Sequence, residues 1–189
     1  SGSTVINVAE DHFGQDGIEN IEDMVAAKGL VYQAVRPLGY CIINLDDVEV
    51  RKYVHSLQGR KILVTQSSLT GREIRPYLKY AEHICYIKNK SFYWKTGDKE
   101  ELIASFADVA ITVDGVARHN VENVMQAICL SYSLGLSCRQ ISRGLKNYQN
   151  TELNNRGRAN LFKYNGGTII VDFAHNPAAI NAILDMSKA

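Results

Sequence analysis

The sequence has 189 residues, of which 46% are hydrophobic, and its 21 Lys and Arg residues nearly balance its 20 Asp and Glu residues. This length suits one or two domains with a sizeable core. The net charge of +1 does not indicate a nucleic-acid-binding surface. We recognise no apolar run of transmembrane length, no signal peptide and no CxxC pair among the four cysteines. We therefore expect a cytoplasmic protein with neither a nucleic-acid nor a membrane partner.

A predicted strand and a predicted helix open the chain, with a polar cluster between them. The apolar residues 5–8 are typical of a strand, and they lead into Glu10, Asp11 and His12. A helix is predicted from residue 21 to residue 36, because Asn20 suits the N-cap position and acidic residues follow in the first turn. The polar cluster therefore lies where a strand ends.

Lys28 occupies an unusual position in that helix. It lies on the buried stripe that the spacing of the apolar residues predicts, formed by Ile21, Met24, Val25, Val31, Tyr32 and Val35. A lysine there either extends its ammonium group to solvent or finds a partner in a site. Periodicity alone favours the first alternative, and the second places Lys28 in a site that begins at His12.

The next segment alternates strands and helices, which predicts a mostly parallel sheet with flanking helices. Strands are expected at residues 39–45 and 61–65, with a helix at residues 48–57 between them. Ligands gather at the carboxyl ends of such strands. Asp46 and Asp47 lie at one of these ends, although capping of the following helix explains them equally well.

Residues 83–106 predict a small antiparallel meander beside the parallel sheet. Short strands are expected at residues 83–87, 91–95 and 100–106, with polar turns between them. The aromatic run from Phe92 to Trp94 lies next to lysines and has two interpretations, a nucleic-acid surface or a half-buried hairpin. The lack of a wider basic patch favours the hairpin.

The last third of the chain begins with two predicted helices, one starting near Asn120 and one after Ser137. Residues 151–155 are polar and resemble a linker. A predicted hairpin follows and ends at Asp172, and Asn176 fits the N-cap of a final helix that begins with proline.

Six features in this order resemble the Mur ligase family, and within it the cyanophycin synthetase subfamily. They are NVAEDH at residues 7–12, the helix lysine, NLDD at 44–47, HNxxN at 119–123, GRAN at 157–160 and DFAHNP at 172–177. Members of the family are ATP-dependent amide ligases that pass through an acyl phosphate. The resemblance implies that His12 binds Mg²⁺ and that Lys28 is carbamylated and helps to hold the ion. A carbamate would supply the oxygen ligands that Mg²⁺ accepts.

The same resemblance assigns residues to the nucleotide. Asn120 is the candidate adenine reader, with Asn123 and His119 as lesser candidates, because an amide can both donate and accept along a base edge. In the C-terminal motifs, the resemblance places four residues close to ATP: Arg158 at the phosphates or base, Asp172 at the ribose or a metal-bound water, and His175 and Asn176 near the nucleotide.

The 189 residues contain no GxxxxGK[ST] phosphate loop, which the family carries upstream of the DH pair. We therefore expect a fragment, with residues 1–153 as part of the central ATPase domain and residues 154–189 as the start of an incomplete Rossmann-like C-terminal domain. The full-length protein is expected to be a ligase that uses ATP, Mg²⁺ and an amino-acid or peptide substrate, and the fragment alone is expected to be inactive.

Alternatives are a peptidoglycan-precursor Mur ligase, a folylpolyglutamate synthetase, or a non-catalytic binding domain. A homo-oligomer is compatible with the sequence.

Overall fold

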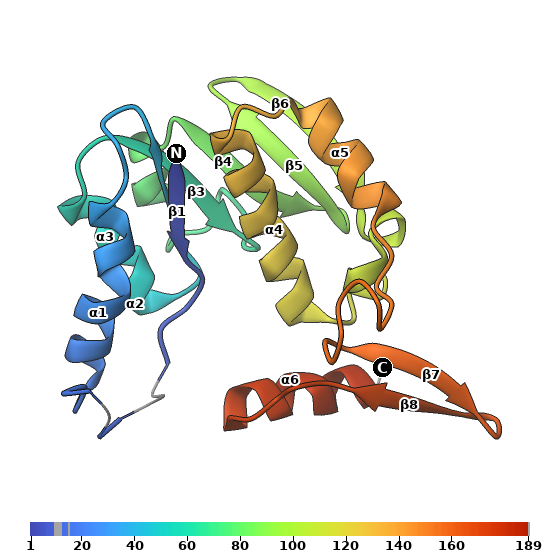
Figure 1. The fold of residues 1–189 in the computed structure, drawn as a ribbon. Helices are drawn as coiled ribbons and strands as arrows, with labels where there is room; N and C mark the ends of the chain where they lie inside the picture. Colours follow the sequence, from blue (N-terminus) through green and yellow to red (C-terminus); the bar gives the residue numbers. More distant parts are fainter. Residues whose placement is uncertain (10–12, 15, 189) are drawn as a thin grey trace.

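The computed structural model describes residues 1–9, 13–14 and 16–188. A six-stranded sheet lies at its centre, and its strands follow one another in chain order (Figure 1). The parallel strands are β1 (Gly2–Val5), β2 (Tyr40–Asn44), β3 (Arg60–Thr65) and β4 (His83–Lys88). β5 (Ser91–Thr96) and β6 (Lys99–Ser105) extend the sheet in antiparallel fashion. The predicted α/β class is confirmed, and the meander continues the parallel sheet instead of lying beside it.

Helices cover both faces of this sheet (Figure 1). One face carries α1 (Ile21–Gln33), α2 (Val48–Arg51), α3 (Tyr53–Ser56) and the 3₁₀ helix η1 (Arg75–Tyr80). The other face carries α4 (Arg118–Ser133) and α5 (Cys138–Asn147), which follow the short 3₁₀ helices η2 (Phe106–Asp108) and η3 (Ala110–Thr112).

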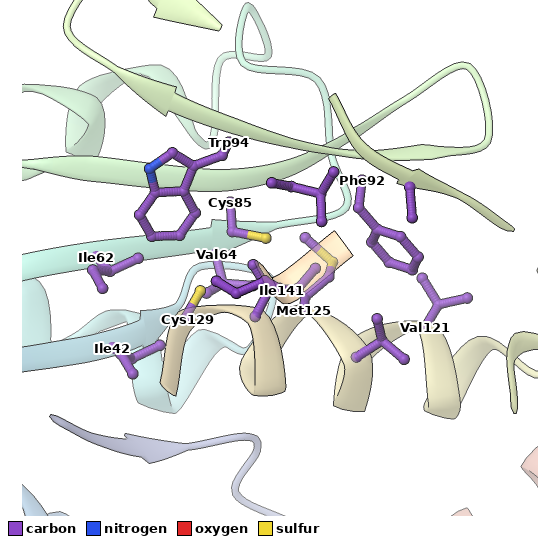
Figure 2. Packing of buried hydrophobic residues seen from close by; sticks show 14 of the residues in the cluster. Ile42, Ile62, Val64, Cys85, Phe92, Trp94, Val121, Met125, Cys129 and Ile141 are labelled. Atoms are coloured by element: carbon purple, nitrogen blue, oxygen red, sulfur yellow. The ribbon is translucent and has the colours of Figure 1, made fainter. Parts of the chain in front are cut away.

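β2 shows why the sheet needs helices on both faces. All of its residues are buried, and successive side chains point to opposite faces. Ile42 packs in the cluster that includes Met125 of α4 (Figure 2), whereas Ile43 belongs to the cluster that includes Met24 of α1. The continuous apolar run in the sequence therefore corresponds to a strand between two cores.

Capping side chains set several helix starts as predicted. Asn20 Oδ1 accepts a hydrogen bond from the Asp23 backbone N–H at 2.9 Å and caps α1. Ser137 and Gln140 form the capping box that opens α5.

Several details differ from the sequence-based expectation. β1 covers Gly2–Val5 instead of residues 5–8, because the backbone groups of Ile6 and Val8 bond to side chains instead of to a strand. α1 ends at Gln33, and the helix expected at 48–57 is split into α2 and α3. Val31 is 42% exposed, so the buried stripe of α1 does not include it.

The C-terminal segment forms a separate small layer. β7 (Asn160–Tyr164) and β8 (Gly167–Val171) pair as an antiparallel hairpin, and α6 (Pro177–Lys188) follows. This segment lies beyond the start of α4 (Figure 1) and contacts it through a small cluster centred on Ala117, Ala159 and Met186. The hairpin and helix agree with the sequence, and a Rossmann-like second domain stays a prediction.

Candidate active site

Parallel strands β1, β2 and β3 end at one edge of the sheet, and Asn44 connects two of these ends. Asn44 is the last residue of β2 and is only 1% exposed. Its Nδ2 donates to the Ile6 carbonyl at 2.7 Å and to Glu122 Oε1 at 2.6 Å, and its Oδ1 accepts from the Asp46 N–H at 3.1 Å. Because this buried amide bonds at both ends, it fixes the exit of β1 relative to β2 and α4.

The two aspartates after β2 fasten neighbouring strand exits. Asp47 caps α2 through two backbone N–H groups, and its Oδ2 also accepts from the Val8 N–H at 3.0 Å. Asp46 accepts from Oγ1 of Thr65, the last residue of β3, at 2.7 Å and from the N–H of the next residue, Gln66, at 2.6 Å. The capping alternative is therefore confirmed for Asp47, and both carboxylates additionally hold the loops at this edge.

Lys28 extends to the exit of β1. Its Nζ donates to the Asn7 carbonyl at 3.2 Å, and the side chain is partly exposed. It lines an open pocket of about 320 Å³ together with residues 4–7 and Val31. His12, the predicted partner of Lys28, lies outside the described residues. The lysine thus has a partner at a strand end, whereas its carbamylation stays a prediction.

The Mg²⁺ site at His12 and Lys28 also stays a prediction. Within the described part of the chain, no three His, Cys, Asp or Glu side chains are grouped so that they could hold a metal. An ammonium group has only hydrogen-bond donors and cannot ligate a cation, whereas a carbamate presents oxygen atoms. Lys28 therefore fits a Mg²⁺ site only in the carbamylated form.

Glu122 of α4 is a residue of this edge that sequence reasoning misses. Burial raises the pKa of its carboxyl group, and the charges of Asp46 and Asp47 raise this pKa further. The side chains of Asn44 and Asn7 act in the opposite direction, because their amide groups stabilise the carboxylate. A partly buried glutamate thus receives an amide donor from the exit of β2 and lies near a second amide at the exit of β1.

A polar pair on α4 is the sequence signal that could have identified Glu122. Glu122 and Gln126 are four residues apart and so lie one turn apart on the same side of the helix. Gln126 is 2% exposed, and its Oε1 accepts from Thr4 Oγ1 of β1 at 2.7 Å. Two polar side chains one turn apart beside an apolar stripe indicate a helix that contacts polar groups of the sheet.

The candidate adenine reader is buried. Asn120 is 4% exposed, its Nδ2 donates to the Ile111 carbonyl of η3 at 3.0 Å, and its Oδ1 accepts from Asn123 Nδ2 at 3.4 Å. Asn120 therefore connects the start of α4 to η3, and Asn123 is the exposed member of the pair. The assignment of either residue to adenine stays a prediction.

A tight turn places His119 at the start of α4. Gly115 has a φ of +87°, and a Cβ atom there would lie 2.4 Å from Phe106 Cδ2, so the turn requires glycine. Burial lowers the pKa of His119, and the nearby charge of Asp172 opposes this shift. His119 and Asp172 are thus neighbours, although they are far apart in the sequence.

The other C-terminal candidates gather at the exit of β8. The Arg158 guanidinium lies over the Phe173 ring at 5.5 Å, and the His175 ring lies 5.2 Å from that same ring. Asp172 Oδ2 accepts from the Ala159 N–H at 2.8 Å. Asn176 Oδ1 accepts from the Ala179 N–H at 2.9 Å, as expected of an N-cap. These residues form a second group, and Ala159, which bonds to Asp172, packs against Ala117 at the start of α4.

Known proteins share sequence similarity with most of this chain. The Mur ligase middle domain matches residues 3–131. Cyanophycin synthetase from Geminocystis herdmanii is 27% identical over 179 residues, which are 95% of this chain and 20% of that protein. UDP-N-acetylmuramate–L-alanine ligase from Clostridium acetobutylicum is 27% identical over 184 residues, which are 97% of this chain and 36% of that protein.

Solved structures show the same fold. The crystal structure of MurF from Acinetobacter baumannii has a TM-score of 0.60 and 20% identity, and the match covers 98% of this chain and 36% of that one. The chain spans about a fifth of the length of the cyanophycin synthetases it matches. Among the described residues, no helix is long and apolar enough to cross a membrane. Because the matched middle domain covers more than half of the sequence, the chain belongs to the Mur ligase family.

Proposed function

We propose that this chain is part of an ATP-dependent carbon–nitrogen ligase that forms an amide bond through an acyl phosphate. The observation that carries the proposal is the position of Lys28, which contacts the exit of β1 from an otherwise largely apolar helix in a Mur ligase fold. ATP would lie between the strand exits and the C-terminal group formed by Arg158, Asp172 and His175. Bound Mg²⁺, held by His12 and carbamylated Lys28, would offset charge on the transferred phosphoryl group.

Within this proposal, the chain's own residues have positioning roles. Asn44 and Asp47 hold the backbone beyond β1, and Asp172 holds the turn that carries Arg158. The amides of Asn120 and Asn123 would contact the adenine, and His175 and Asn176 would lie close to the nucleotide. We also propose residues 1–153 and 154–189 as parts of the central and C-terminal domains.

The proposed substrates follow from the relatives. Cyanophycin synthetases match 95–97% of the chain at 26–27% identity, which favours arginine as the amine and an aspartate side chain as the carboxylate. A cell-wall precursor ligase is the second candidate, because such ligases also match at 26–27% identity. A folylpolyglutamate synthetase and a non-catalytic binding domain are the remaining alternatives.

Phosphate release by the full-length protein tests these proposals. The assay contains ATP, Mg²⁺ and a primed cyanophycin chain, with and without arginine, and we expect arginine to be required for turnover. Release that ignores arginine but responds to a cell-wall precursor or a folate would contradict the arginine assignment and leave the ligase proposal standing. No response to any amine acceptor would contradict the ligase proposal and favour a binding domain.

A further inference from the structure

Glu122 enters the site from the opposite layer of the molecule. Lys28 belongs to α1, Asn44 ends β2 and Asn7 lies just beyond β1, whereas Glu122 belongs to α4. Its Oε1 accepts the short 2.6 Å bond from Asn44 Nδ2, and that same nitrogen donates to the Ile6 carbonyl at 2.7 Å. One carboxylate oxygen therefore orients the amide that holds the first residue beyond β1.

The contacts continue from Glu122 to Lys28. The Asn7 side chain lies close enough to the Glu122 carboxyl group to lower its pKa, and the Asn7 carbonyl accepts from Lys28 Nζ at 3.2 Å. The next N–H along the backbone, that of Val8, donates to Asp47 Oδ2 at 3.0 Å. Residues 6–8 are thus held at three successive positions, and Glu122 contributes to the first through Asn44 and adjoins the second.

Burial and nearby negative charge disfavour the ionised form of the Glu122 side chain. Its side chain is partly buried, and Asp46 and Asp47 are close enough to raise its pKa. A partly desolvated carboxylate beside two others is unfavourable unless its hydrogen bonds compensate. The hydrogen bond comes from Asn44, and the Asn7 amide also favours the carboxylate.

We propose that Glu122 is a positioning residue that acts through Asn44 and Asn7 to hold residues 6–8, and thereby keeps the Lys28 amine at the exit of β1. This inference rests on the proposed function, because it names how the Lys28 site is arranged. The carboxylate contacts neither the substrate nor Lys28 in this role. It determines where the Asn7 carbonyl lies, and this carbonyl anchors the lysine.

Hydrogen exchange of the 189-residue chain tests the proposal without any ligase assay. In Glu122→Ala we expect the Val8 amide to exchange about tenfold faster or more, while the Ile43 and Met125 amides change less than about threefold. We also expect the Lys28 side-chain NMR signal, identified by its absence in Lys28→Arg, to shift. Glu122→Gln keeps an acceptor for Asn44 and should stay within about threefold of wild type at Val8.

Glu101→Ala is the matched control, because it removes an exposed glutamate from β6. We expect it to leave both the Val8 exchange rate and the Lys28 signal unchanged. Unchanged Val8 exchange in Glu122→Ala would overturn the proposal. So would an equal rise at Val8, Ile43 and Met125, since that pattern reports only a less stable core. Failure of Glu122→Gln to retain protection would also overturn it.

A second measurement uses the full-length ligase. Glu122→Ala should lower kcat about tenfold with a KM for ATP within about twofold of wild type, and Glu122→Gln should recover most of kcat. A normal kcat in Glu122→Ala would overturn the proposal. If the wild-type protein shows no ligase activity, the proposed function fails, and the exchange experiment still decides the role of Glu122.

Discussion

Lys28 shows at the scale of one residue how the site is built on the fold. Its neighbours on α1 pack in the core, whereas its amine contacts the Asn7 carbonyl at 3.2 Å. In the full-length protein we expect Lys28→Ala to lower kcat of the proposed reaction by about 10³-fold or more, because it removes electrostatic support for that reaction, and bicarbonate should not restore turnover. Phosphate release under saturating ATP measures this effect.

Lys52→Ala is the control for this substitution, because Lys52 is an exposed lysine next to α2. It should retain wild-type kcat. Wild-type activity in Lys28→Ala would show that Lys28 only extends to solvent from the edge of the helix, and it would remove the observation that carries the ligase proposal.

His83 is a second residue whose surroundings lead to a prediction. Burial lowers the pKa of His83, and its ring nitrogens lie 3.1 Å from Tyr40 Oη and 2.7 Å from Thr96 Oγ1. As the pH falls below about 6.5, the unfolded chain takes up a proton before the folded chain does, so stability decreases. We expect His83→Gln to reduce this loss between about pH 7.5 and pH 5.5, as measured by urea unfolding.

Wild type and His83→Gln contain the same titrating groups apart from His83. Burial also lowers the pKa of His119, whereas the raised pKa of Glu122 acts in the opposite direction on acidification. The difference between wild type and His83→Gln therefore isolates His83. Exposed His55 provides the control, and an equal effect of His55→Gln would contradict the assignment to burial.

At the scale of elements, the turn before α4 and the interior of α5 respond oppositely to the same substitution. Gly115 has positive φ and no room for a Cβ atom beside Phe106, whereas Gly144 lies within α5 with no atom within 4 Å of a Cβ. We expect Gly115→Ala to lower the free energy of unfolding by about 1–3 kcal/mol. Gly144→Ala should raise it by about 0.5–1 kcal/mol, because alanine favours a helix.

Urea unfolding of the two alanine variants measures both changes. The pair separates backbone conformation from the general effect of adding a methyl group. Stabilisation by Gly115→Ala would mean that the turn can change its conformation, and it would remove the proposed reason for the placement of His119 at the start of α4.

The elements also show what the sequence could predict. Strands β2 to β6 and helix α4 follow from local patterns, because continuous apolar runs and a regular stripe report burial directly. Local patterns place β1 at residues 5–8, but residues 6 and 8 bond to side chains from distant parts of the chain, and local patterns do not contain such partners. They do not indicate Glu122 for the same reason, since its hydrogen bond comes from Asn44, which is 78 residues away in the sequence.

At the scale of the whole molecule, the candidate residues fall into two groups on different layers. The first group, which contains Lys28, Asn44 and Glu122, lies at the carboxyl edge of the six-stranded sheet. The second group, which contains Arg158, Asp172 and His175, lies at the C-terminal hairpin. α4 connects them, because Glu122 accepts a hydrogen bond from Asn44 of the first group and the charge of Asp172 of the second acts on His119. A change in the position of the C-terminal segment would therefore act on both groups through one helix.

This arrangement predicts that the 189-residue chain alone binds ATP weakly. The proposed base and ribose contacts come from α4 and the second group, but the 189 residues contain no GxxxxGK[ST] loop to surround the phosphates with backbone N–H groups. We expect a Kd for ATP with Mg²⁺ of about 1 mM or weaker, which corresponds to a binding free energy of about −4 kcal/mol.

Isothermal titration calorimetry measures this value, and adenosine provides the control because it lacks phosphates. Similar weak affinities for adenosine and ATP would indicate that only base and ribose contacts contribute. A micromolar Kd for ATP would contradict the prediction and show that the strand exits already contain a phosphate site.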